Sequence, residues 1–268
     1  MIKNVLSIAG VDPSGGAGVL ADIKAMSALG TYAMGVVAAL TAQNTQGVTG
    51  VMPVPASFVT EQLDTLFADV RVDAVKIGML GAIDVMESVA KAIERYRPPH
   101  VVLDTVMVAK SGDRLMPDEA VDFFRSRMLP LADMITPNLP EAGVLLNREL
   151  ATLDDMRGAL VELDALCNHK AVIYLKGGHL EEGESKDMIF NHGQVIELPF
   201  EKIHTKNTHG TGCTLSSALA ALWAQTDDVE VTVRKAKAYI AQAIAASDEL
   251  TVGSGHGPVH HFVELYRK

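Results

Sequence analysis

The sequence contains few cysteines, few aromatic residues and no excess of positive charge. Cys167 and Cys213 are the only two cysteines among 268 residues, which excludes a disulfide framework of the kind found in small secreted domains. Aromatic residues make up 5%, too few for a binding surface of stacked rings. The formal net charge of −10 argues against nucleic acid or an anionic membrane as a partner, because both require clustered Lys and Arg. An anionic substrate would therefore have to be held by a local site.

Targeting segments and zinc-binding spacings are also missing. Residues 1–5 run directly into a strand pattern without a signal peptide, and no apolar run is long enough to span a membrane. The nine histidines show no H-x-x-x-H spacing, and the adjacent His260 and His261 are expected on different faces of a terminal helix. We therefore expect a cytoplasmic protein without zinc.

Short apolar runs alternate with helical patterns along the chain. An apolar content of 48% is enough for a sizeable core, and no repeat or linker divides the chain, which predicts one domain over residues 1–268. Nearly continuous apolar runs are typical of strands covered by helices on both faces, so the pattern predicts a three-layer α/β/α fold with a mainly parallel sheet. The expected strands lie at 5–9, 33–40, 74–78, 101–104, 134–136 and 171–176, and a hairpin with a three-residue connection joins 187–190 to 194–198. The expected helices lie near 18–29, 56–69, 84–96, 118–128, 139–146, 153–167, 212–225, 230–250 and 258–266.

A glycine turn, Gly210-Thr211-Gly212-Cys213, precedes a run of small residues. Its two glycines let backbone N–H groups converge, and the following helix adds the positive end of its dipole, so the turn suits a phosphate oxygen. The alternative is an ordinary turn with a Thr cap before a buried helix. Cys213 favours the anion hole, because a helix N-terminus stabilises a thiolate and packing alone does not require a thiol there.

This turn resembles that of the ribokinase-like superfamily, and within it that of the hydroxymethylpyrimidine and phosphomethylpyrimidine kinases of thiamine biosynthesis. Sugar kinases of the superfamily carry Gly-Ala-Gly-Asp at this place, with the Asp as base, whereas this chain has Cys213. The matches continue in the family's order from residue 5 to residue 262 and include the ending 252–262. The resemblance implies a ribokinase-like fold and catalytic roles for Gly210, Gly212 and Cys213.

A second glycine-rich segment, 12–18, follows the first predicted strand. Gly16, Gly18 and Ala21 formally satisfy a relaxed dinucleotide fingerprint. No Asp or Glu lies between Asp22 and Glu61 to hold a ribose, which weakens an oxidoreductase interpretation. A tight strand-to-helix turn is the alternative. In the resembled kinases this loop and Asp22 lie beside the substrate, and the backbone of Gly10 touches the pyrimidine.

Gln43 is expected just past the second strand. A carboxamide presents one acceptor and two donors in a plane, which matches the edge of an aminopyrimidine, although the pattern alone also fits a polar loop residue. The resemblance implies that Gln43 makes this contact, that Met79 packs against the ring and that Val106 also binds substrate. Without the resemblance, Met79 would be a core residue.

Two acidic positions are candidate metal ligands. Asp104 ends a strand, where it could hold a metal or simply occupy a turn, and the following loop 110–112 could close over the substrate. Asn138 and Glu141 form a capping-box pattern at a helix start, and the resemblance places this motif near magnesium and phosphates. The related dual-activity pyridoxal kinases carry a cysteine in the lid where this chain has Ala109, which favours the pyrimidine.

Lys176 ends a strand before two glycines, where it could contact phosphate or be an ordinary surface lysine. The resemblance places it on the transferred phosphates. It implies further ATP or phosphate contacts from Thr208 and Thr211, and Lys237 is a weaker candidate.

The implied reaction moves the γ-phosphoryl group of ATP, with Mg²⁺, to the hydroxymethyl group of 4-amino-5-hydroxymethyl-2-methylpyrimidine and then a second one to that monophosphate. A homodimer is implied as well. The alternatives are a pyridoxal kinase on the same fold, a nicotinamide oxidoreductase and a nucleotide-binding regulator without catalysis.

Overall fold

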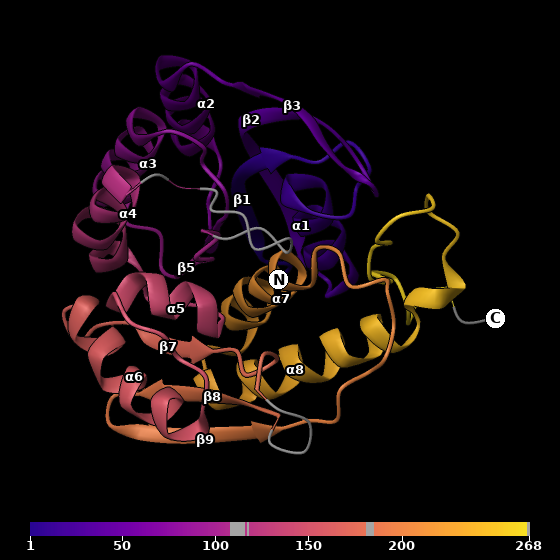
Figure 1. The fold of residues 1–268 in the computed structure, drawn as a ribbon. Helices are drawn as coiled ribbons and strands as arrows, with labels where there is room; N and C mark the ends of the chain where they lie inside the picture. Colours follow the sequence, from indigo (N-terminus) through magenta and orange to yellow (C-terminus); the bar gives the residue numbers. More distant parts are fainter. Residues whose placement is uncertain (108–115, 117, 181–184, 267–268) are drawn as a thin grey trace. The chain divides into compact units, whose positions relative to one another are not determined.

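The computed structural model describes residues 1–107, 116, 118–180 and 185–266. The chain divides into two compact units, the first formed by Met1–Val101 with Ile203–Lys268 and the second by Val102–Lys202. Each unit combines strands and helices in the α/β manner predicted (Figure 1). The single domain expected over residues 1–268 stays a prediction.

The first unit contains four strands in the order β3-β2-β1-β4. β1 pairs in parallel with both β2 and β4, and β3 pairs antiparallel to β2. Strands β1 and β4 are buried almost throughout, as their continuous apolar sequences predict. Their bounds are β1 (Asn4–Val11), β2 (Tyr32–Asn44), β3 (Gly47–Pro53) and β4 (Ala74–Ile77).

Helices cover this sheet because each carries an apolar face. α1 packs against β1, β2 and α7, α8 packs against α7, and α2 packs against β2 and α3. α7 is buried over most of its length because its small residues allow close approach to the sheet. The helices of this unit are α1 (Gly18–Ala28), α2 (Ala56–Asp69), α3 (Ile83–Tyr96), α7 (Thr211–Thr226) and α8 (Val229–Ala245).

Two sequence predictions in this unit were wrong. β2 continues to Asn44, so Gln43 lies within a strand, and the unpredicted β3 pairs with it although all seven β3 residues are exposed. The terminal helix expected at 258–266 is a series of turns instead. Its start is tied to α8, because His260 N–H donates to Ala243 O (2.9 Å) and Tyr239 O–H donates to His261 O (2.7 Å).

The second unit follows the strand order β5-β6-β7-β8-β9, with β5, β6 and β7 parallel and the last two antiparallel. α6 packs against β7, β8 and α5. The strands are β5 (Val101–Leu103), β6 (Met134–Ile135), β7 (Val172–Leu175), β8 (Lys186–Asn191) and β9 (Gln194–Pro199). The helices are α4 (Asp118–Phe123), α5 (Leu139–Leu146) and α6 (Leu153–Leu166).

The hairpin and the helix near 118–128 differ in detail from prediction. Asn191 pairs with Gln194, so the β8–β9 connection has two residues, His192 and Gly193, both with positive φ. α4 passes into a π-helical turn at Phe124–Met128. No helix in the described part of the chain has the length and apolarity that a membrane crossing requires.

Candidate active site

The glycine turn caps α7, as predicted. Gly210 is the N-cap residue with φ 74°, and a Cβ at this position would lie 1.7 Å from Gly16 O, so the turn accepts only glycine. Thr211 Oγ1 donates to Thr208 O (2.8 Å), which closes the turn. Cys213 is half-buried at the third helical position, in the first turn of α7, where the helix dipole is positive. The turn therefore has the backbone geometry of an anion site.

The glycine-rich loop 12–18 packs directly against this turn. Asp12 accepts hydrogen bonds from Ser14 N–H (2.9 Å) and Ala17 N–H (3.0 Å), and its Oδ2 lies 2.8 Å from His209 Nε2. Burial alone would raise the pKa of Asp12, but the hydrogen bonds from His209 and Ser14 outweigh it and lower the pKa. Sequence reasoning did not single out Asp12 or His209 individually.

Gly10, Gln43 and Met79, three of the residues predicted to bind the substrate, lie in the first unit. Gly10 N–H donates to Met79 O (3.0 Å), and a Cβ at Gly10 would lie 2.8 Å from the Met79 methyl group. Thr41 Oγ1 lies 3.2 Å from Gln43 Oε1 and also donates to Val11 O (2.9 Å). The contact with Thr41 orients the Gln43 carboxamide at the end of β2.

Asp22 is fully buried in a charged network. Its carboxylate accepts two hydrogen bonds from Lys76 Nζ (2.8 and 2.9 Å), one from Ser7 Oγ (2.6 Å) and one from Ser217 Oγ (2.8 Å). A side chain at Gly78 would lie 2.8 Å from the Lys76 ammonium, so glycine leaves room for it. The network joins β1, α1, β4 and α7. This burial favours a supporting role for Asp22, whose predicted contact with substrate stays a prediction.

Sequence reasoning missed Lys76, although a signal was present. Lys76 is the one charged residue in the apolar strand Ala74–Ile77, and both its side chain and that of Asp22 are 0% exposed. A charge in a continuously buried strand requires a partner, since an unpaired one is too costly. The partner could not be identified without the fold.

A second cluster lies within the Val102–Lys202 unit. Lys176 Nζ is 3.7 Å from Asp104 Oδ1 and 3.8 Å from Glu141 Oε2, and Asp104 Oδ1 also accepts from Thr136 Oγ1 (3.0 Å). Both carboxylates are buried. The predicted capping box is confirmed, because Asn138 Oδ1 accepts from Glu141 N–H and Glu141 Oε2 accepts from Asn138 N–H. The structure thus brings together four of the residues predicted to bind metal and phosphate.

The electrostatics of this cluster suit an added cation. Burial raises the pKa of Glu141, and the neighbouring Asp104 raises it further, against the effects of Lys176, Asn138 and Thr105. Carboxylate oxygens are the ligands that Mg²⁺ prefers, and Asp104 and Glu141 place two of them close to Lys176. Within the described ranges, no group of three or more His, Cys, Asp or Glu side chains is arranged to hold a metal by itself. The donor set therefore fits a magnesium ion that also takes phosphate or water ligands.

Three other predicted positions are only partly buried. Val106 and Thr208 are half-buried, and Lys237 is half-buried on α8. The loop 110–112 proposed as a lid, with Ala109, lies outside the described residues.

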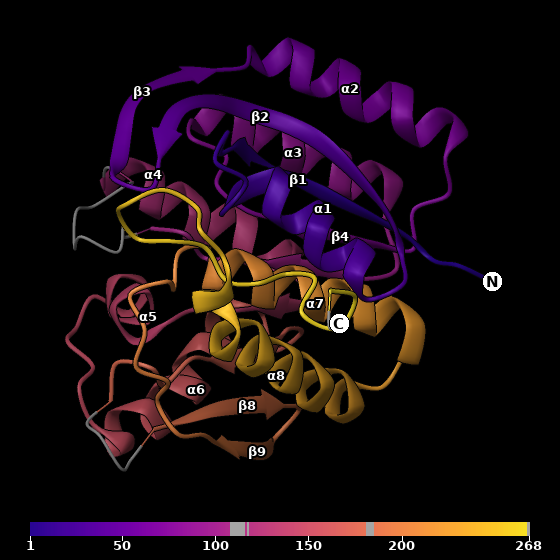
Figure 2. The same cartoon turned by 90° about the vertical axis from the view of Figure 1, so that its right-hand side faces the viewer.

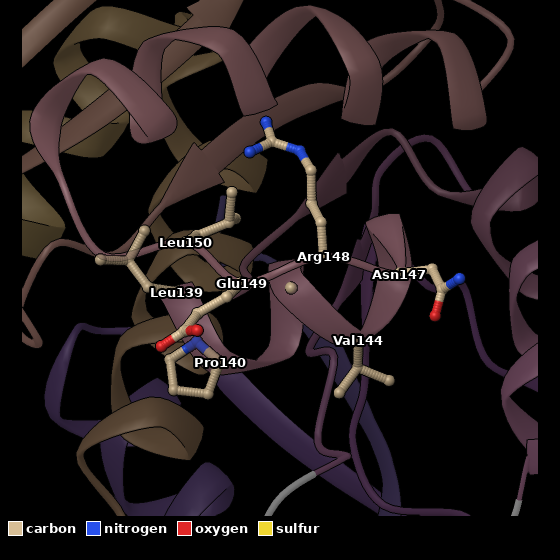
Figure 3. A pocket seen from close by; sticks show the side chains of 8 residues that line it. Leu139, Pro140, Val144, Asn147, Arg148, Glu149 and Leu150 are labelled. Atoms are coloured by element: carbon tan, nitrogen blue, oxygen red, sulfur yellow. The ribbon is translucent and has the colours of Figure 1, made fainter.

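A surface hollow of about 520 Å³ lies beside α5 (Figure 3). Arg148 at its rim pairs with Glu162 (2.7 Å) and Asp155 (3.6 Å), so its charge is already balanced. None of the predicted site residues lines the hollow.

Solved structures identify the class of protein. The crystal structure of phosphomethylpyrimidine kinase from Clostridium difficile 630 matches with a TM-score of 0.81 and 36% identity, over 90% of this chain and 99% of that one. An ADP complex of Bacillus subtilis pyridoxal kinase matches with a TM-score of 0.89 and 34% identity over the full length of both chains. The chain is a kinase with the ribokinase-like α/β fold, as predicted.

Sequence comparison is more specific. A model of the phosphomethylpyrimidine kinase family matches residues 12–260. The hydroxymethylpyrimidine/phosphomethylpyrimidine kinase of Escherichia coli (strain K12) is 50% identical over 261 residues, which cover 97% of each chain. The chain belongs to the phosphomethylpyrimidine kinase family.

Proposed function

We propose that the chain transfers the γ-phosphoryl group of ATP to the alcohol of 4-amino-5-hydroxymethyl-2-methylpyrimidine and then to the resulting monophosphate, in thiamine biosynthesis. The observation that carries the proposal is the match over residues 12–260 to the kinase family, with relatives named for both substrates. The glycine turn capping α7 and the acidic cluster around Lys176 supply the chemistry that this reaction needs.

The turn 210–213 holds the transferred phosphoryl group through its backbone N–H groups. Gln43 forms hydrogen bonds with the edge of the aminopyrimidine, while Gly10 and Met79 contact the ring. Cys213 orients the attacking hydroxyl group and accepts its proton. In the second transfer the nucleophile is a phosphate group that is already anionic. That step therefore depends less on a base.

In the Val102–Lys202 unit, Lys176 neutralises phosphate charge, and Asp104 and Glu141 hold Mg²⁺ directly or through water. When bound, the magnesium ion supplies positive charge to the phosphate oxygens. Asn138 supports Glu141 through the capping box, and Thr208, Thr211 and Lys237 add contacts to ATP. Val106 contacts the pyrimidine.

Replacing Cys213 tests its role as base. For Cys213→Ala we expect the alcohol transfer to slow by about 10²-fold or more, the range for loss of a general base, and the transfer to the monophosphate to slow much less. The measurement is the rate of each step with purified substrate. Cys167→Ala is the matched control, because Cys167 is buried and its pKa is raised to about 12 by burial and then by Asp164. Equal losses in both steps would contradict the base role.

Pyridoxal is the second candidate substrate. The observation that favours it is the fold match to Bacillus subtilis pyridoxal kinase over the full length of both chains. Coupled assays of ATP consumption with each alcohol separate the two, and we expect a higher kcat/KM for the pyrimidine. A preference for pyridoxal would reverse the assignment.

We also propose a cytoplasmic homodimer. The dimer is supported by β3, which stands at the end of the strand order and exposes Val48, Val51 and Met52 by 53%, 58% and 60%. An exposed apolar edge strand is a site for pairing between chains. A second copy of the same edge can pair with it across a two-fold axis.

A further inference from the structure

Three glycines, Gly253, Gly255 and Gly257, alternate with other residues in the C-terminal segment 253–258. Gly253, Gly255 and Gly257 each face a close neighbour. Both ribbon views place this yellow segment beside the far end of the β2–β3 hairpin (Figures 1 and 2). We call residues 253–258 the C-terminal strap.

The first half of the strap is bound to Thr45, at the tip of this hairpin. Gly255 N–H donates to Thr45 Oγ1 (3.1 Å), and His256 N–H donates to Thr45 O (2.8 Å). A Cβ at Gly255 would lie 2.1 Å from Thr45 O, and one at Gly253 would lie 2.2 Å from Thr45 Oγ1. The strap therefore approaches the hairpin as closely as a backbone without side chains allows.

The second half of the strap is bound to the segment that leads into the glycine turn. Gly257 N–H donates to Asn207 Oδ1 (3.1 Å), and His209 N–H donates to Gly257 O (3.0 Å). A Cβ at Gly257 would lie 2.3 Å from Asn207 Oδ1. Asn207 is held in turn, because its Nδ2 donates to Asp248 Oδ1 (2.7 Å).

These contacts connect the two parts of the first unit that the proposed reaction uses. Thr45 lies two residues beyond Gln43, and Asn207 lies three residues before Gly210. We propose that the C-terminal strap positions the pyrimidine-reading end of β2 relative to the phosphoryl-binding turn, with Thr45, Gly255 and Gly257 as positioning residues. This inference rests on the proposed function, because it assigns the two ends of the strap to the alcohol and the phosphoryl group.

A positioning role and a purely structural role have different kinetic signatures. Phosphoryl transfer depends on alignment, so a displaced alcohol lowers kcat while ATP still binds and can still be attacked by water. A loss of folded protein lowers alcohol transfer and alcohol-independent ATP hydrolysis by the same factor. The ratio of these two rates in one preparation therefore distinguishes them.

Gly255→Ala tests the strap, and Gly47→Ala is the matched control. Gly47 lies on the same hairpin with no atom within 4 Å of an added Cβ. For Gly255→Ala we expect kcat for the pyrimidine alcohol to fall by about tenfold to a hundredfold, with KM for ATP within about twofold and alcohol-independent hydrolysis retained. Gly47→Ala should behave as the unmodified chain.

If Gly255→Ala fails to fold, a pair of variants at Thr45 distinguishes a positioning role of the strap from a purely structural one. Thr45→Val keeps the shape and removes the acceptor for Gly255 N–H, so it should lower the ratio of transfer to hydrolysis, and Thr45→Ser should restore it. The positioning role of the strap would be overturned by a proportional loss of alcohol transfer and ATP hydrolysis. It would also be overturned if Thr45→Val and Thr45→Ser had the same ratio of transfer to hydrolysis. If the unmodified chain transfers no phosphoryl group to the pyrimidine, the proposed function is wrong, and the positioning role of the strap is wrong with it.

Discussion

His261 shares a hydrogen bond of 3.1 Å with Thr214, the residue that follows Cys213 in α7. Burial, with Lys24, His260 and His209 nearby, lowers the pKa of His261 to about 3. The imidazole is therefore neutral in the folded protein across the physiological pH range. Its neutral ring connects the C-terminal turns to the start of α7.

This lowered pKa predicts a pH dependence of stability. The unfolded chain protonates this histidine near pH 6.5, and the folded chain does so only near pH 3, so the unfolded state binds more protons between these values. Stability is therefore lost as pH falls from about 6.5, by on the order of 2 kcal/mol at pH 5 for this group. His261→Gln should flatten the slope of unfolding free energy between pH 7 and pH 5, measured by urea denaturation. An unchanged slope in His261→Gln would show that His261 does not cause the pH dependence of the unfolding free energy. The control is His192→Asn, in the exposed β8–β9 turn.

The buried Asp22–Lys76 pair connects elements that are separate in the sequence. Ser7 of β1, Asp22 of α1, Lys76 of β4 and Ser217 of α7 share one network. Ser217 lies four residues beyond Cys213, so the network also sets the position of the helix whose N-terminus forms the glycine turn. An ion pair at 0% exposure has no water to replace a lost partner.

Removing one partner of this pair should be costly. Lys76→Met leaves a buried carboxylate unpaired, and we expect a loss of about 3–5 kcal/mol in unfolding free energy. The double variant Asp22→Asn with Lys76→Met should be more stable than Lys76→Met alone, because no charge remains buried. Urea denaturation of both single variants and the double variant gives the coupling energy. Additive losses would mean that the pair is not coupled.

Some elements were predictable and others were not, for local reasons. α5 was predicted with its exact bounds because Asn138 and Glu141 form a capping box that neighbouring residues encode. β3 was missed because its exposed sequence, with two glycines and a proline, has no strand pattern and is ordered by pairing with β2. The helix expected at 258–266 was wrong because contacts with α8 hold that backbone in turns.

At the scale of the whole molecule, the exposed edge of β3 predicts the oligomeric state. We expect Val51→Lys to shift the protein from dimer to monomer at micromolar concentration, since a charge on an edge strand blocks pairing between chains. Sedimentation equilibrium measures the mass. Val195→Lys is the matched control, because Val195 is 51% exposed on β9, an end strand of the Val102–Lys202 unit. A dimer that persists in Val51→Lys would place the interface elsewhere.

The sequence by itself determined the α/β class, most strand and helix positions, the glycine turn ahead of α7 and the capping box, because each depends on residues close together in the chain. Only the tertiary structure decided the partner of Lys76, the Asp12–His209 contact and the binding of the strap to Thr45. These contacts join residues 54, 197 and 210 positions apart. Local periodicity carries no information on such contacts, since they are set by the packing of elements that lie far apart in the sequence.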